Sequence, residues 1–221
     1  MRAAYERLTS ILSDPDECGM SALDCIYEIM ENEVQRRDSN ALARRLKEAK
    51  ICLPNARPDT IDFSIERGLD KNKIDALLTM RWMEEHQNII ITGAAGCGKT
   101  FLACALVNQA CIKGRAARVV RVPLLLNQMA ASHQIVETYF KKLKEMKTID
   151  LLVLDDWGIG QLDARSRQDL LEIINERYMY ASTIVTSVLP VNKWSEYIND
   201  TTYSDAILDR LVSVSHRVEL N

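Results

Sequence analysis

A chain of 221 residues with 47% apolar and 27% charged residues can fold around one main core with a small appendage. Its net charge of −3 argues against nucleic-acid binding over the whole surface, so any basic surface has to be local. No segment approaches the ~20 apolar residues of a membrane helix, and the first residues lack a signal-peptide core. We therefore expect a cytoplasmic protein without a membrane partner.

The six cysteines form no C-x-x-C pair and the three histidines are isolated, which argues against a zinc site or a disulfide framework.

Residues 1–56 are expected to form a helical domain. After a loop at residues 14–16 and 19, apolar residues recur at the helical spacings of three and four, namely Leu23, Ile26, Ile29, Met30 and Val34. A second helical stretch is predicted over 40–51. Pro54 and Pro58 break this pattern. We therefore predict a domain boundary near residue 56, followed by a connector over 57–73.

Strands and helices alternate from residue 74 to residue 221. Short apolar runs predict strands at 88–92, 118–122, 151–154, 182–186 and 216–220. Helices are predicted at 100–112, 136–147, 163–179 and 203–213. This alternation predicts an α/β fold with a five-stranded parallel sheet flanked by helices. In such folds the ligand binds beyond the carboxyl ends of the strands.

Residues 93–100 lie between the first predicted strand and its helix and match the pattern G-x-x-x-x-G-K-[ST]. The glycines let backbone N–H groups converge on phosphate oxygens at a helix N-terminus. Lys99 can then reach the β- and γ-phosphates, and the Thr100 hydroxyl can bind Mg²⁺. An incidental glycine-rich turn is disfavoured, because the pattern lies between a strand and a helix. We predict ATP and Mg²⁺ as cofactors, bound by Gly93, Ala94, Ala95, Gly96, Cys97, Gly98, Lys99, Thr100 and Phe101.

Two adjacent acids end the third predicted strand, as in a Walker B motif. Asp155 is expected to hold Mg²⁺, directly or through water, because that ion prefers carboxylates and phosphates. Asp156 is then placed to orient the attacking water. The alternative is that the two acids cap the next helix. With a phosphate loop already present, the metal-binding interpretation is favoured.

Further blocks of sequence carry a family resemblance. They are residues 67–70, 102–103, 154–158, 169–174, 176–178, 186–187, 189–191, 194, 205–212 and 216–217. With these motifs the chain resembles the IstB family, the ATP-binding helpers of insertion-sequence transposons, which is similar to the helicase loader DnaC within the AAA+ group. The resemblance runs from about residue 22 to residue 219.

The resemblance implies an AAA+ sheet with the phosphate-loop strand central and a small N-terminal helical domain. It also implies ATP-dependent self-association on double-stranded DNA and cooperation with a transposase in target selection. In this group the arginine before the fifth strand, here Arg210, acts on the nucleotide of a neighbouring subunit and neutralises charge on the γ-phosphate. A surface ion pair with Asp209 or Asp205 is the alternative role for Arg210. Arg177 is a second candidate for the finger.

The chain departs from the family pattern in two places. Related loaders have Asn or Gln where this chain has Val188, which cannot hydrogen-bond a phosphate or a water, so Thr186 or Ser187 would have to substitute. The family also continues into a tail with another nucleotide-sensing arginine, whereas this sequence stops at Asn221. The sequence therefore supports ATP binding more strongly than ATP turnover.

A basic cluster in the N-terminal part is the predicted DNA contact. Arg44, Lys47 and Lys50 are spaced to share a helix face that can grip phosphates without reading sequence. The full set is Arg36, Arg37, Arg44, Arg45, Lys47 and Lys50. A solvated helix face is the alternative, and the resemblance favours DNA. Three hypotheses remain: a DNA-dependent ATPase that serves a transposase, a DnaC-type helicase loader, and a hydrolysis-deficient phosphate-loop scaffold.

Overall fold

The computed structural model describes residues 2–13, 21–64 and 67–221, and the chain divides into two compact units, residues 1–45 and 46–221. The boundary lies earlier than the expected residue 56, because the segment after residue 45 belongs to the second core. Ala49 and Ala56 are fully buried, and the Ala49 carbonyl accepts a hydrogen bond from the Val119 amide at 2.9 Å. The loop expected at residues 14–16 and 19 lies outside the described residues. The roles assigned to the two parts stay predictions.

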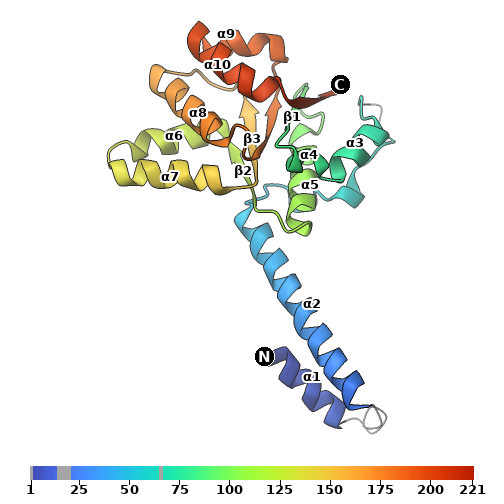
Figure 1. The fold of residues 1–221 in the computed structure, drawn as a ribbon. Coiled ribbons are helices and arrows are strands. Elements are labelled where there is room, and N and C mark those ends of the chain that lie inside the picture. The colour runs from blue at the N-terminus through green and yellow to red at the C-terminus, as the bar shows by residue number, and fades with distance from the viewer. Residues whose placement is uncertain (1, 14–20, 65–66) are drawn as a thin grey trace. The chain divides into compact units, whose positions relative to one another are not determined.

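The first unit consists of α1 (Arg2–Ser13) and most of α2 (Ala22–Glu48) (Figure 1). The sequence predicts two helical stretches here, but α2 is one continuous helix because no Gly or Pro interrupts residues 22–48. The Arg7 guanidinium forms an ion pair with Glu28 within this unit. Most of the predicted apolar stripe is exposed: Leu23, Ile26, Met30 and Val34. None of the described helices is both long and apolar enough to cross a membrane.

The second unit contains a five-stranded sheet in which every neighbouring pair is parallel, in the order β2-β3-β4-β1-β5. Its strands are β1 (Asn88–Gly93), β2 (Ala117–Arg121), β3 (Leu151–Trp157), β4 (Ser182–Ser187) and β5 (Ser215–Leu220). The predicted α/β class and parallel sheet are therefore confirmed. One expectation needs correction: β4 is the middle strand, and β1, which leads into the phosphate loop, lies between β4 and β5.

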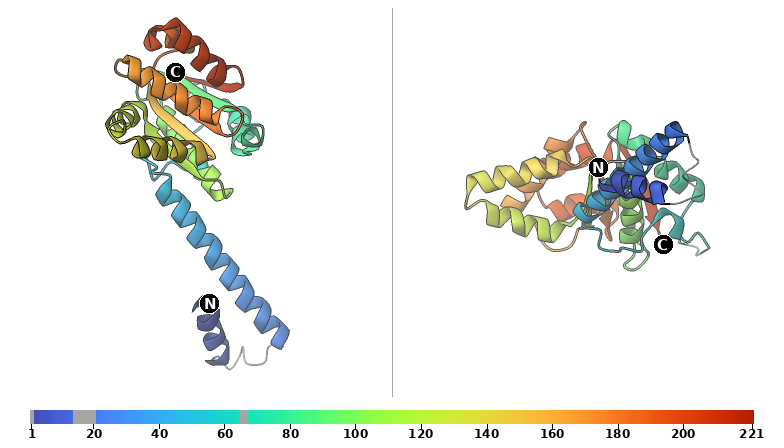
Figure 2. Two further views of the ribbon diagram at one scale, coloured as in Figure 1. Left: turned by 60° about the vertical axis from the view of Figure 1, so that its left-hand side comes forward. Right: turned by 90° about the horizontal axis from the view of Figure 1, so that it is seen from below.

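Helices cover both faces of the sheet (Figure 1). One face packs on α5 (Lys99–Ile112), which α3 (Lys71–Leu78) supports from outside. The other face packs on α6 (Val122–Ser132), α7 (Val136–Thr148), α8 (Ala164–Arg177) and α10 (Thr201–Val212). Because strand side chains alternate between faces, Ile90 and Val185 join the core under these four helices. The helices α6 and α7 lie side by side as a hairpin (Figure 2).

Several short elements were not predicted from the sequence. They are η1 (Pro58–Thr60), α3, α4 (Arg81–Glu84), α6, η2 (Val191–Lys193) and α9 (Trp194–Ile198). Val122 was expected to end a strand but instead begins α6, because Pro123 has no N–H and its fixed φ suits the first turn of a helix. The strand β3 extends three residues beyond Leu154, so that both acids of the predicted site belong to the strand itself.

Candidate nucleotide site

The loop between β1 and α5 has the backbone of a phosphate cradle. Gly93, Gly96 and Gly98 all have positive φ, at 150°, 82° and 98°. At Gly93 a side chain would overlap the Leu220 carbonyl of the neighbouring strand β5, so only glycine fits. The Lys99 ammonium, on a side chain 9% exposed, donates to the carbonyls of Gly93 (3.0 Å) and Ala94 (2.6 Å). The N-terminus of α5 and the Lys99 ammonium thus both place positive charge at the phosphate loop, which suits an anion.

The phosphate loop and β3 are joined by a contact between a hydroxyl and a carboxylate. Thr100 Oγ1 donates to Asp155 Oδ1 at 2.9 Å, and Asp155 is 4% exposed at the carboxyl end of β3. The Thr186 hydroxyl, from β4, donates to the same oxygen. A buried carboxylate beside two hydroxyls offers the hard oxygen ligands that Mg²⁺ prefers. The donor set therefore fits the ion that the phosphate-loop pattern implies, with Thr100 and Asp155 as its ligands.

Asp156 has an unusual backbone and a cationic partner. Its φ is 62°, the left-handed region that non-glycine residues seldom adopt. Its carboxylate pairs with the Arg121 Nε at 2.6 Å, across from the end of β2. The hydrogen bond with Asp156 raises the pKa of Arg121 above its ordinary value. The sequence did not indicate Arg121, because nothing local to residues 118–122 marks a contact with an acid 35 positions away.

Five of the predicted site residues line one cavity of about 210 Å³, namely Ala95, Gly96, Lys99, Thr100 and Asp156. Its lining comes from the phosphate loop, from the end of β3 and from the end of β4: Ala95, Gly96, Lys99, Thr100, Asp156, Ile159, Thr186, Ser187 and Val188. Phe101 lies on the first turn of α5, half-buried, and is not among these lining residues. The cavity brings the phosphate-binding loop and the proposed water-orienting carboxylate to one place.

The hydroxyls that could replace a polar side chain at position 188 already have partners. Val188 lines the cavity and is 42% exposed. Thr186 donates to Asp155, and the Ser187 hydroxyl donates to the Trp157 carbonyl at 2.7 Å. Ser187 also accepts from the Leu189 amide at 3.0 Å. Both hydroxyls therefore hold the strand ends in place while they line the cavity.

Arg67 is a site residue that sequence reasoning did not assign. Its Nη1 lies so close to Gly98 that a methyl group on that glycine would be 2.8 Å away. Its Nη2 donates to the Asp62 carbonyl at 2.9 Å, and its buried Nε has no hydrogen-bond partner among the described residues. A guanidinium at the N-terminus of α5 is repelled by the positive end of the helix dipole. An anion bound between them would offset this repulsion.

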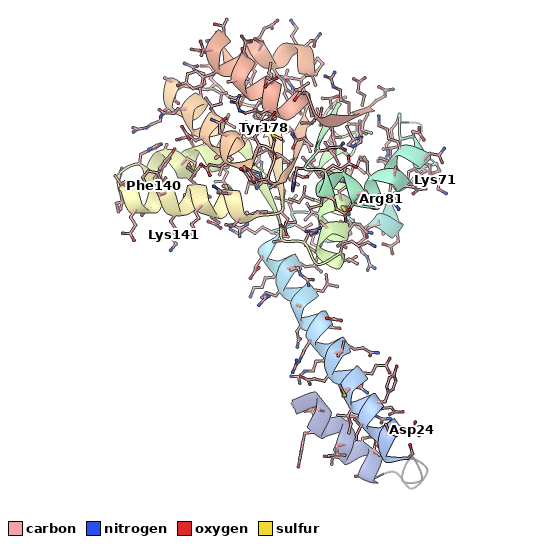
Figure 3. The ribbon with its side chains drawn as sticks, viewed as in Figure 1. Asp24, Lys71, Arg81, Phe140, Lys141 and Tyr178 are labelled. Carbon is pink, nitrogen blue, oxygen red and sulfur yellow. The ribbon has the colours of Figure 1, made fainter. Side chains whose placement is uncertain are left out.

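Arg210 lies at the opposite end of the sheet from the loop of its own chain. The side-chain amide of Asn88, the first residue of β1, donates to the Arg210 carbonyl at 3.1 Å. The phosphate loop begins at the other end of β1, about 17 Å further along the strand. The Arg210 guanidinium donates to the Ala206 carbonyl and lies 5.7 Å from the ring centre of Tyr178, which is labelled in Figure 3. It forms no ion pair with Asp205 or Asp209, both of which are described.

Arg177 cannot serve as a finger, contrary to the second expectation. Its side chain is 2% exposed, because it lies between the end of α7 and the start of β4 rather than at the surface. Its guanidinium donates to Thr183 Oγ1 (3.1 Å) and to the carbonyls of Met146 (2.5 Å), Ile149 (2.8 Å) and Ser182 (2.6 Å). Burial lowers the pKa of Arg177 to about 9, so it remains a cation at neutral pH. Arg177 is a structural clamp.

The helix face predicted from Arg44, Lys47 and Lys50 does not include Lys50. Arg36 and Arg37 pair with Glu33 on α2 (3.8 and 3.0 Å). Arg44 and Lys47 are exposed on the same helix, and Arg45 is half-buried. Lys50 lies beyond the helix end at Glu48, with φ 51°, so its expected helical alignment with Arg44 and Lys47 is wrong. The chain turns there because residue 50 adopts the left-handed conformation that ends many helices.

Comparisons with known proteins agree with this geometry. A family model described as IstB-like ATP binding protein matches residues 1–221. A protein of Sinorhizobium fredii, named for an insertion sequence and for ATP binding, is 38% identical over 213 residues, covering 96% of this chain and 86% of the relative. A similarly named protein of Pseudomonas fluorescens is 38% identical over 162 residues, covering 73% and 70%.

Several solved structures have a similar fold. DnaI matches with a TM-score of 0.63 at 20% identity, over 77% of this chain and 96% of that one. The DnaC helicase loader matches with 0.61 at 19% identity, over 76% and 98%. AMPPCP-bound DnaA of Aquifex aeolicus matches with 0.61 at 20% identity, over 76% and 51%. Identities this low show the fold alone, which is a parallel α/β sheet flanked by helices.

Proposed function

Because this chain belongs to the IstB-like ATP-binding protein family, we propose that it binds and hydrolyses MgATP as the DNA-binding helper of a transposase. The observation that carries the nucleotide part is the contact between Thr100 and Asp155, which joins the phosphate loop to the end of β3 beside Lys99. The names of the relatives, which refer to insertion sequences, support the transposition part.

In this proposal each site residue has one task. The loop amides of residues 93–100 and the Lys99 ammonium hold the phosphates. Thr100 and Asp155 would hold Mg²⁺, which would supply positive charge to neutralise the phosphates. Asp156 orients the water, since it is the carboxylate that lines the cavity next to Lys99 and Thr100. The Arg67 guanidinium adds positive charge at the same end of α5.

The position of Arg210 is the reason that the proposal includes self-association. A guanidinium at the far end of the sheet cannot assist the nucleotide of its own chain, so its proposed partner is the site of an adjacent subunit. A head-to-tail interface of this kind forms rings or filaments. Double-stranded DNA and a transposase are the further proposed partners.

Two variants test the nucleotide site. Lys99→Ala removes the ammonium that holds the loop and the phosphates, so binding of a fluorescent ATP analogue should be lost. Asp156→Asn keeps shape and hydrogen bonding but cannot act as an anion, so it should bind MgATP and release no phosphate. Phosphate release should be measured with and without duplex DNA. Normal hydrolysis by Asp156→Asn would contradict the role of Asp156.

The same assay separates the competing functions. A chain that binds MgATP but releases no phosphate, even with DNA, is a scaffold rather than an ATPase. A chain whose hydrolysis responds to a replicative helicase and not to DNA or a transposase is a helicase loader.

A further inference from the structure

A second concavity, of about 310 Å³, lies on the side of the sheet where β2 forms the edge. Its walls are β2, the segment at residues 50–52, and the hairpin of α6 and α7. We call it the β2 groove. Four cations line it, namely Lys50, Arg118, Arg121 and Lys142. Its apolar lining residues include Val119, Leu124, Leu125 and Met146. All belong to the second unit.

Positive charge dominates the β2 groove. Its four cations face one lining acid, Glu145, which pairs with Arg118. Arg121 pairs with Asp156 outside the lining, so Lys50 and Lys142 are the lining cations without an ion pair among the described residues. Lys142 donates to the neutral side-chain oxygen of Gln128 at 3.0 Å. The Arg118 Nε is buried and has no hydrogen-bond partner among the described residues. In a chain of net charge −3, this is a local basic surface of the kind that an anionic polymer requires.

The edge strand is closed to an extended peptide at this point. A peptide that joins a sheet edge bonds to the free backbone groups of the edge strand. Here the Val119 amide of β2 already donates to the Ala49 carbonyl at 2.9 Å. Recognition in the groove therefore relies on side chains. Cations beside aliphatic side chains suit the phosphates and sugars of a nucleic-acid backbone.

We propose that the β2 groove binds the sugar–phosphate backbone of DNA, with Lys50, Arg118 and Lys142 on the phosphates. The proposal rests on the proposed function, which makes DNA a partner, and gives that partner a site. Lys50 keeps the role expected for it, but in this groove instead of on the face of α2. Arg121 also lines the groove, but it holds Asp156 and is therefore left unchanged in the test.

The first test compares two double variants. Arg118→Gln with Lys142→Gln removes two groove cations, and Lys141→Gln with Lys144→Gln removes two exposed cations of α7 outside the groove (Figure 3 labels Lys141). Fluorescence anisotropy with a labelled duplex gives affinity at several salt concentrations. The groove variant should bind about tenfold or more weakly, with a plot of log K against log salt shallower by about two. The α7 variant should lose little of either.

Lys50→Gln alone is a third variant, since it changes an exposed side chain outside any helix or strand and leaves the edge strand untouched. It should lower the salt slope by about one. Equal slopes for wild type and all groove variants would overturn the proposal. So would a wild-type chain that binds MgATP but no DNA.

The second test locates the ligand through cysteine alkylation. Cys52 is exposed and lines the groove, whereas Cys97 belongs to the phosphate loop. With reductant present, duplex DNA should slow alkylation of Cys52 by iodoacetamide, and MgATP should slow that of Cys97, as read by peptide mass spectrometry. Protection of Cys52 by DNA without protection of Cys97 by MgATP would contradict the proposed ATP binding and support DNA binding in the β2 groove. Protection of Cys52 by poly-glutamate and not by DNA would show a protein ligand instead.

Discussion

The glycines of the phosphate loop differ in what a side chain would meet. At Gly93 a methyl group would overlap the Leu220 carbonyl, a backbone atom of β5 that cannot move without disturbing the sheet. At Gly96 no atom lies within 4 Å, so only the positive φ of 82° opposes a side chain. Steric exclusion and conformational strain are thus separated at two positions of one loop.

Gly93→Ala should therefore lower the free energy of unfolding by about 3 kcal/mol, because strain and overlap add. Gly96→Ala should lower it by only about 1 kcal/mol. For a chain of this length, the midpoint of thermal unfolding should fall by about 2–4 °C for each kcal/mol. Equal losses for the two variants would mean that the Leu220 contact does not constrain Gly93.

Arg67 allows a test of charge at the phosphate end of α5. Arg67→Gln keeps most of the length of the side chain but removes its charge, so MgATP affinity should fall about fivefold to tenfold. The matched control is Lys113→Gln, an exposed cation at the opposite end of α5. Titration with a fluorescent ATP analogue measures both. An affinity loss as large in the control would point to overall charge, not to the position of Arg67.

At the scale of elements, Arg177 ties three segments together. Its guanidinium joins the end of α8 to the carbonyls at the end of α7 and to the start of β4. Arg177→Met preserves the length of the stem but leaves buried carbonyls without donors. Each unpaired group costs about 1–3 kcal/mol, so the free energy of unfolding should fall by at least about 3 kcal/mol.

Urea unfolding with Arg165→Met as control measures the effect of that clamp. Arg165 is an exposed arginine on the same helix, and its replacement should change stability by less than about 0.5 kcal/mol. A small loss for Arg177→Met would mean that water reaches the three carbonyls.

Element positions were predictable where burial leaves a plain pattern. Buried parallel strands are continuous apolar runs, so Ile89–Ile91 and Leu151–Leu154 marked β1 and β3 to within a few residues. Helix ends were harder, because Lys50 ends its helix in the left-handed conformation without a glycine. The short helices α4 and α9 carry too few residues for a period to show.

The candidate site also contains one contact that the sequence predicts and others that it does not. The meeting of Thr100 with Asp155 follows from parallel topology, since the phosphate loop follows the carboxyl end of β1 and Asp155 lies near the carboxyl end of β3 in the same sheet. Arg67 and Arg121 could not be predicted, because their partners Gly98 and Asp156 are 31 and 35 positions away and no local pattern marks such contacts. The β2 groove likewise arises only when residues 50–52 meet the edge strand.

At the scale of the whole molecule, the proposed function pairs Arg210 with the nucleotide site of a partner copy. The phosphate loop and Arg210 lie at opposite ends of β1. Under this proposal, a complete catalytic site combines the loop of one subunit with the arginine of another. Hydrolysis should rise more steeply than in proportion to protein concentration, because each added subunit also completes the site of a neighbour.

The most direct measurement is phosphate release from a mixture of two inactive variants, Lys99→Ala and Arg210→Ala, with MgATP and duplex DNA. Each variant alone should release little phosphate. The equimolar mixture should recover about a quarter of the wild-type rate, because about one interface in four pairs an intact loop with an intact Arg210. No recovery in the mixture, or full activity of Arg210→Ala alone at every protein concentration, would contradict a nucleotide site shared between subunits.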